Sequence, residues 1–227
     1  MPPSSSPAPL EQVPRRLIVA TANLGKLREF RALLAGLPFE LASLADLKLS
    51  SPEETGDSFL ANATLKARHA AASSGSAAIA DDSGLEVAAL NGGPGIYSAR
   101  YAGVDADDQA NNRKLLCALA GVAPEQRRAR YRCALVFVEH AQDAAPLTAE
   151  ASWEGFILEA PRGTGGFGYD PYFWLPELAK TAAELEPAQK NALSHRGRAM
   201  RALRDALSAR AVSAAGGPQG RAPSTRA

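Results

Sequence analysis

The apolar positions of this chain follow two periods in turn, one typical of buried strands and one typical of amphipathic helices. A short apolar run at residues 16–21 predicts a strand. A helical pattern follows the turn at Asn23 and Gly25, with apolar residues gathered on one face. That face comprises Leu27, Phe30, Leu33, Leu34 and Leu37. The chain therefore opens with a strand, a turn and a helix.

Elements of both kinds alternate through the middle of the chain. A loop at residues 51–57 leads into a predicted helix over residues 58–73. The next predicted strand, residues 77–80, stops at an Asp-Asp-Ser-Gly turn. Acidic residues in the first turn and Gly121 beyond the end predict a helix over residues 105–120.

The second half continues the mixture. Residues 131–138 alternate and then become apolar on both sides, which is typical of a central strand, and residues 147–158 form a candidate antiparallel neighbour. A helical pattern ends the folded body, with one apolar side made of Leu193, Met200, Leu203 and Leu207. These elements predict an α/β fold with a mixed central sheet flanked by helices.

Composition changes at both ends of the chain. Residues 1–14 are rich in Pro and Ser, and residues 212–227 are rich in Gly, Pro, Ser and Arg. We expect both to be disordered extensions of one folded domain at residues 15–211. The 25 Lys and Arg residues nearly balance the 24 Asp and Glu residues, for a net charge of +1, so no global field attracts nucleic acid or an anionic membrane.

The sequence also lacks the apolar segments of membrane and secreted proteins. No run approaches the roughly 18 apolar residues of a membrane helix, and the N-terminal residues do not form a signal peptide. The two cysteines, Cys117 and Cys133, have no metal-ligand spacing. We expect a cytoplasmic protein with reduced thiols and with neither a nucleic-acid nor a membrane partner.

Residues 21–26 are the first candidate for chemistry. The segment Thr21, Ala22, Asn23, Leu24, Gly25, Lys26 lies where a strand becomes a helix, so backbone N–H groups and a lysine can meet an anion. It is not a Walker A loop, which requires another glycine spacing. Taken alone, the pattern favours a capped helix with Lys26 in water over a phosphate site.

Acidic residues in predicted loops and at strand ends form the second candidate. Hard divalent cations prefer such oxygen ligands, and Mg²⁺ needs only one or two protein carboxylates beside substrate phosphates. If Asp81 and Asp82 continue an extended backbone, they point to opposite faces and only one can meet a given ion. Otherwise the pair belongs to a simple turn. The acids are Glu53, Glu54, Asp57, Asp81, Asp82 and Glu86.

The glycine-rich run at residues 163–168 matches GxGxxG but lacks the context of a dinucleotide fingerprint. It follows Pro161-Arg162 and leads to Pro171, which leaves no helix N-terminus for a pyrophosphate. We expect a close-approach loop whose Phe167 and Tyr169 sandwich a planar base or fill the core. The last candidate is a polar cluster before the final helix: Lys190, Asn191, Ser194, His195 and Arg196.

Seven ordered motifs together resemble the inosine triphosphate pyrophosphatase family, over residues 17–207. They are Thr21-x-Asn23-x-x-Lys26, Glu53-Glu54-Thr55-Gly56, Asn62-Ala63-x-x-Lys66-Ala67, Asp81-Asp82-Ser83-Gly84-Leu85, Pro94-Gly95-Ile96-Tyr97-Ser98-Ala99-Arg100, Gly166-Phe167-Gly168-Tyr169-Asp170-Pro171 and Ser194-His195-Arg196. The resemblance implies an elongated, two-lobed fold with a nucleotide cleft between the lobes, usually as a homodimer. It also implies Mg²⁺-dependent hydrolysis of ITP, dITP and XTP to the monophosphate and pyrophosphate, which removes deaminated purines from the nucleotide pool.

The resemblance assigns roles by position. It implies that Asp82 is the general base and a metal ligand, that Glu53 is the other metal ligand, and that Ser83 contacts substrate. Residues Thr21 to Lys26 match the phosphate-binding turn. The base-binding loop and further substrate contacts match Phe167, Gly168, Tyr169, Asp170, Lys190, His195 and Arg196.

Two positions depart from the pattern, and two other functions stay open. Ala22 stands where many members have Gly, and Ala61 stands where many have Glu. One alternative is a related pyrophosphatase with another base preference, and the other is a nucleotide-binding protein without catalysis. A nicotinamide-dependent oxidoreductase rests only on the rejected GxGxxG match.

Overall fold

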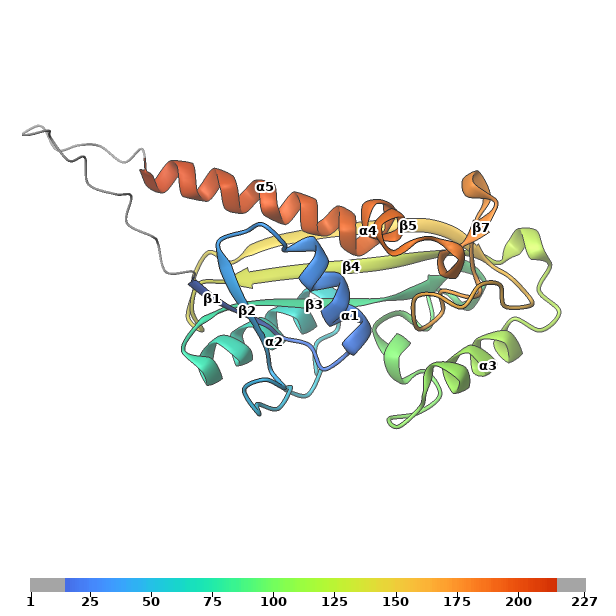
Figure 1. Ribbon diagram of the computed structural model, residues 1–227. Helices are drawn as coiled ribbons and strands as arrows, with labels where there is room; N and C mark the ends of the chain where they lie inside the picture. Colours follow the sequence, from blue (N-terminus) through green and yellow to red (C-terminus); the bar gives the residue numbers. More distant parts are fainter. Residues whose placement is uncertain (1–14, 216–227) are drawn as a thin grey trace, which may run out of the picture.

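A computed structural model describes residues 15–215, which form one seven-stranded mixed sheet with helices on both faces (Figure 1). The strands are β1 (Arg15–Val19), β2 (Phe39–Ser43), β3 (Ala77–Val87), β4 (Arg128–Val138), β5 (Leu147–Ile157), β6 (Phe173–Leu175) and β7 (Lys180–Thr181). The α-helices are α1 (Leu24–Leu33), α2 (Phe59–Ser74), α3 (Asp108–Ala118), α4 (Pro187–Leu193) and α5 (His195–Ala215). Short 3₁₀ helices include η2 (Gly95–Arg100). The predicted α/β fold with a mixed sheet is confirmed.

The strand order is β2-β1-β3-β4-β5-β6-β7, and within residues 15–215 the parallel pairs are β1 with β2 and β1 with β3. Helix α1 connects β1 to β2, and α2 precedes β3 and packs on the opposite face of the sheet. The chain therefore leaves the carboxyl end of β1 where the connections diverge to the two faces. Such a switch point is where open α/β sheets form a ligand crevice.

Strand β3 is longer than the sequence pattern indicated. The predicted strand stopped at residue 80, but β3 continues through Asp81, Asp82 and Ser83 to Val87, and its whole length from Ala78 pairs with β4. Gly84 permits this continuation, because a Cβ there would lie 2.4 Å from the carbonyl oxygen of Gly95. The acidic pair is thus in a central strand and not in a turn, so its two side chains face opposite sides of the sheet.

Three apolar clusters hold the helices on the sheet. On one face, α1 and α5 pack on the sheet through residues such as Phe30 and Met200, and on the other face α2 packs through Ala63 and Ala67. Beyond them the long strands extend to a third cluster around α3, which includes Leu115. Figure 1 shows α5 lying along the long strands and α3 near the end of the sheet away from β1 and β2. Within residues 15–215, no helix combines the length and the apolar character needed to cross a bilayer.

The boundaries of the folded body differ slightly from expectation. Helix α5 continues to Ala215, four residues beyond the predicted end at residue 211, because Ala-rich sequence supports a helix. The expected extensions at residues 1–14 and at 216–227 lie outside the described residues. The predicted helix over 105–120 is shorter, at Asp108–Ala118, since Asp107 caps it by accepting a hydrogen bond from the Ala110 N–H.

Candidate active site

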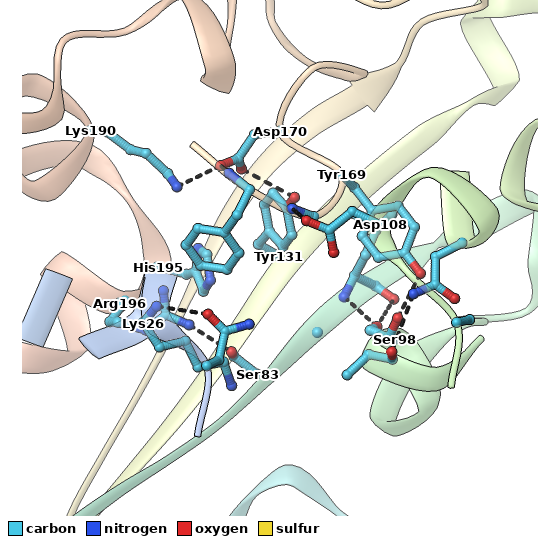
Figure 2. A pocket seen from close by; sticks show the side chains of 18 residues that line it. Lys26, Ser83, Ser98, Asp108, Tyr131, Tyr169, Asp170, Lys190, His195 and Arg196 are labelled. Atoms are coloured by element: carbon cyan, nitrogen blue, oxygen red, sulfur yellow. Dashed lines mark hydrogen bonds and ion pairs between the residues drawn. The ribbon is translucent and has the colours of Figure 1, made fainter. Parts of the chain in front are cut away.

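A cavity of about 250 Å³ lies beside the turn that follows β1 (Figure 2). Its polar lining comes from segments far apart in the sequence, which β3, β4 and the start of α5 bring together. The lining residues are Asn23, Lys26, Ser83, Gly84, Leu85, Ser98, Ala99, Ala106, Asp108, Asn111, Tyr131, Phe167, Gly168, Tyr169, Asp170, Lys190, His195 and Arg196.

The turn after β1 is built by Asn23, whose side chain caps helix α1. The Asn23 Oδ1 atom accepts a hydrogen bond of 3.0 Å from the backbone N–H of Lys26, and its own N–H donates to Thr21 Oγ1 at 3.2 Å. Gly25 is required here because a Cβ would lie 2.6 Å from the Phe167 ring. The structure therefore joins this turn to the glycine-rich loop, with Lys26 of the turn and Phe167 of the loop both lining the cavity.

Asp81 lies on the face of β3 that α1 and α5 cover. It forms ion pairs with Lys26 and with Arg196, whose Nε lies 3.0 Å from Asp81 Oδ2. Burial alone would raise the pKa of Asp81, but the charges of Arg196 and Lys26 outweigh it and hold the pKa well below its ordinary value. Asp81 therefore stays charged and fixes two cations that line the cavity.

Asp82 lies on the opposite face and meets helix α2. Its carboxylate is 2.7 Å from Lys66 Nζ and accepts a 3.3 Å hydrogen bond from Asn62 Nδ2. Burial raises the pKa of Asp82, and the charge of Lys66 works against that rise. A carboxylate held partly out of water, with a raised pKa, suits a general base.

The second acid beside Lys66 is Glu54. Its Oε1 lies 2.8 Å from Lys66 Nζ, and its Oε2 lies 2.5 Å from Arg100 Nη1 of η2. Asn62 anchors this loop, since its Oδ1 accepts a 2.8 Å hydrogen bond from the Gly56 N–H. Burial would raise the pKa of Glu54, but Lys66 and Arg100 lower it overall.

Glu53 does not lie with these groups. Its side chain is exposed, and no hydrogen bond or ion pair within residues 15–215 joins it to Asp82. Glu54 is thus the acid that shares Lys66 with Asp82, and the metal-ligand role that the resemblance implies for Glu53 stays a prediction. Neighbouring side chains in an extended loop point in different directions, so the doublet alone did not distinguish them. Of the other candidate acids, Asp57 is exposed and Glu86 pairs with Arg130.

The glycine-rich loop brings the predicted base-binding residues to the cavity. Asp170 is buried, and its Oδ2 lies 2.6 Å from Lys190 Nζ and accepts a 2.9 Å hydrogen bond from the Phe167 N–H. Lys190 Nζ also lies 4.6 Å from the centroid of the Phe167 ring. No helix follows the glycine run, which agrees with the rejection of a dinucleotide fingerprint.

His195 lies at the bottom of the cavity against β4. Its ring stacks on Tyr131 with centroids 4.7 Å apart and planes 12° apart, and the Tyr131 hydroxyl donates to Asp170 Oδ1 at 3.2 Å. Burial, with a further contribution from Arg196, lowers the pKa of His195 well below its ordinary value. The Nδ1 atom of this ring is buried without a hydrogen-bond partner in the described part of the chain.

Glu29 completes the site and was not anticipated from the sequence. It lies one helical turn after Lys26 on α1, and its carboxylate pairs with Arg196 and, at 2.8 Å, with Lys190. Glu29 follows Lys26 by three positions on a helix, so helical spacing was the available signal for it, whereas Lys66 stood in a recognised motif but received no role there. Tyr131 gave no signal beyond its place in an alternating strand.

Two rows of paired charges result. The first runs from the base loop to the turn after β1 and comprises Asp170, Lys190, Glu29, Arg196, Asp81 and Lys26. The second lies on the other face of β3 and comprises Asp82, Lys66, Glu54 and Arg100. Each cation in the two rows is neutralised by an acid, and a polyanionic ligand with its counter-cation can exchange partners with these groups.

The residues beside Lys66 fit a divalent cation. Within residues 15–215 no three His, Cys, Asp or Glu side chains are grouped to hold a metal by themselves. Asp82 and Glu54 both place a carboxylate oxygen against the same ammonium group, however, so both face one cationic group. Two carboxylates are the donor set that Mg²⁺ uses when phosphates and water supply the rest.

The sequence is also similar to proteins of known family. A dITP/XTP pyrophosphatase of Thioalkalivibrio sulfidiphilus is 55% identical over 195 residues, covering 86% of this chain and 100% of that protein. A HAM1 protein from Coxiella burnetii has 44% identity and a TM-score of 0.79, covering 86% of this chain and 99% of that one. A nucleoside-triphosphatase / dITP/XTP pyrophosphatase from Mycobacterium abscessus has 44% identity and a TM-score of 0.63. The match covers 83% of this chain and 98% of that one.

The family model of the Ham1 family matches residues 17–206, nearly the whole described chain. This range contains all seven motifs on which the resemblance was based and confirms it. The chain belongs to the Ham1 family.

Proposed function

We propose that this protein hydrolyses the non-standard purine nucleoside triphosphates ITP, dITP and XTP to the monophosphate and pyrophosphate. The observation that carries the proposal is the pair of buried carboxylates at the middle of β3: Asp81 pairs with two cations that line a base-sized cavity, and Asp82 shares Lys66 with Glu54. The relatives named dITP/XTP pyrophosphatase, at 52–55% identity over most of the chain, support the same reaction.

The triphosphate end of the substrate belongs beside Lys26 and Lys66. Cleavage between the α and β phosphates develops negative charge on the departing pyrophosphate, and fixed cations stabilise that charge. Lys26 is 16% exposed and Lys66 is 9% exposed, so both act from a partly dehydrated site where electrostatic stabilisation is strong.

Asp82 acts as the general base in this proposal. The attacking water must lose a proton, and Asp82 is the carboxylate with a raised pKa that faces the triphosphate end. Asp82 and Glu54 would hold Mg²⁺, which when bound supplies positive charge and makes water more acidic. Asn62 keeps Asp82 oriented by donating to its Oδ2.

The base end of the substrate belongs between Phe167 and His195. Hypoxanthine and xanthine present a carbonyl acceptor where adenine has an amino donor, and the His195 ring, which lines the cavity, can donate to that carbonyl through a protonated ring nitrogen. Arg196 is less suited to recognise the base directly, because its donors already pair with Asp81, Glu29 and Ser83. Its role is to keep these neighbouring side chains of the base pocket in position.

A panel of nucleotides with product identification tests the proposal. We expect ITP, dITP and XTP to give a monophosphate and pyrophosphate in the presence of Mg²⁺, with a far higher kcat/KM than ATP or GTP. Preference for another base would favour a related pyrophosphatase. Tight ITP binding without turnover would favour a nucleotide-binding protein without catalysis.

The expected homodimer and cytoplasmic location remain predictions of the sequence. Light scattering after size-exclusion chromatography of the purified full chain measures the first, and fractionation of cells measures the second.

A further inference from the structure

The tip of the glycine-rich loop is held from outside by the segment that runs from η2 into α3. The Gly168 N–H donates to Asp108 Oδ2 at 2.7 Å, and the Gly168 carbonyl accepts a 2.9 Å hydrogen bond from Asn112 Nδ2. The Tyr169 hydroxyl donates to the Ser98 carbonyl at 2.7 Å. Figure 2 shows Asp108 beside the Tyr169 ring, on the side of the cavity away from Lys190.

Both backbone groups of Gly168 are therefore captured by one helix. Asp108 and Asn112 lie four positions apart on α3, so they share a helical face. Gly168 has a φ of +61°, a left-handed conformation that favours glycine. The two contacts fix the loop at the residue between its two aromatic side chains.

The contact with Gly168 leaves one polar atom of Asn112 without a hydrogen-bond partner in the described part of the chain. Its Nδ2 donates to two carbonyl oxygens, those of Gly168 and Asp108, which fixes the orientation of the amide. Its Oδ1 is consequently buried without a hydrogen-bond partner within residues 15–215. A buried polar atom without a partner is destabilising, so the contact with Gly168 is not explained as a simple gain in stability.

The captured residue controls the position of Phe167. The Phe167 N–H is held by Asp170 on the cavity side, and Gly168 is the next residue along the loop. The Phe167 ring lies against Gly25 of the phosphate turn, so a shift of the loop would change the width of the slot above His195. The contact of Asp108 with Gly168 therefore influences the position of Phe167, which lines the cavity.

We propose that Asp108 and Asn112 form a latch that holds Phe167 at a fixed height over the base pocket and so contributes to base selectivity. This inference rests on the proposed function of the same cavity. Both are positioning residues. Loss of the latch is expected to weaken the binding of ITP and its discrimination from GTP, with little effect on the rate of the bound substrate.

Three variants separate the latch from the stability of α3. Asp108→Ala removes the acceptor, whereas Asp108→Asn keeps an oxygen that can accept from Gly168. Asp107→Ala removes the same charge from the neighbouring residue and weakens the helix cap, but leaves the contact with Gly168 intact. The measurements are KM and kcat for ITP and GTP, and unfolding in urea.

We expect Asp108→Ala to raise KM for ITP about fivefold to tenfold, with kcat changed less than about twofold. The ITP-to-GTP ratio of kcat/KM should fall, and Asp108→Asn should restore most of both values. Asp107→Ala should lower stability in urea without changing KM. An unchanged KM in folded Asp108→Ala, or an equal rise in Asp107→Ala, would overturn the latch.

Measurement of ITP binding by calorimetry tests the latch independently of the proposed hydrolysis reaction. In an Asp82→Asn background, Asp108→Ala should raise the Kd for ITP by the same factor whether or not the parent protein hydrolyses ITP. If the parent fails to release pyrophosphate and the Kd still rises, the proposed reaction is wrong and the latch stands. If hydrolysis occurs and the Kd is unchanged, the latch is wrong.

Discussion

Replacement of Asp81 by Asn tests the buried charge row through the stability of the fold. Asp81 has a fully buried side chain, and it pairs with Lys26 and with Arg196, whose side chain is only 2% exposed. The substitution conserves volume, so it opens no cavity, but it leaves the two cations with one fewer acid.

The size of the loss follows from this geometry. Breaking a buried ion pair from one side costs about 3–5 kcal/mol. Arg196 keeps its contact with Glu29, and the Asn carbonyl can still accept a hydrogen bond, so we expect a loss near the lower end, about 3 kcal/mol. With an m-value of about 2 kcal/mol per molar urea, the midpoint should fall by about 1.5 M.

Urea unfolding of the full chain, followed by the fluorescence of Trp153 and Trp174, measures this loss at neutral pH. Asp105→Asn serves as a matched control because its side chain is exposed. A double-mutant cycle with Arg196→Met should show the combined loss to be smaller than the sum of the single losses. A loss below about 1 kcal/mol in Asp81→Asn, or strict additivity in the cycle, would refute the reasoning.

Two further substitutions test separate parts of the account. Gly25→Ala should raise KM for ITP about tenfold in steady-state kinetics, because the new Cβ would lie 2.6 Å from the Phe167 ring; an unchanged KM would contradict the close approach. Asp143 tests pH dependence: burial works to raise its pKa, but hydrogen bonds from the Glu139 and Ala145 N–H groups lower it overall. Its stabilisation is complete above the unfolded pKa of about 3.9 and is lost as pH falls further, so the stability deficit of Asp143→Asn should shrink below about pH 4; a deficit unchanged down to pH 3 would contradict this.

The sequence predicted the order and type of the principal elements because their periods are unambiguous. The helices around Leu27 and Ala63 and the antiparallel pair β4 and β5 lie where the patterns placed them. Strand β2 was missed, since its five residues are only partly buried at an edge of the sheet and give no clean alternation. Edge strands carry a weak signal for this reason.

The features of the site were likewise predicted from the sequence only in part. The expectation that Asp81 and Asp82 face opposite sides followed from strand geometry, and the structure confirms it by pairing them with different helices. The contact of Glu54 with Lys66 could not be predicted from the sequence, because it depends on how Asn62 fixes the loop at Gly56. The role of Glu29 likewise depends on α4 and α5 bringing Lys190 and Arg196 to α1, which is a long-range contact.

The most direct test of the account compares two neighbouring acids in the same assay. Its central claim is that Asp82 and Glu54 share the cation that activates the triphosphate, while Glu53 points to solvent. Glu54→Gln and Glu53→Gln remove the same charge one residue apart, so any effect of net charge is common to both. With ITP and saturating Mg²⁺, we expect kcat to fall by about 10²-fold or more in Glu54→Gln and to stay within about threefold of the parent in Glu53→Gln. The reverse pattern, or full activity in Glu54→Gln, would contradict the account.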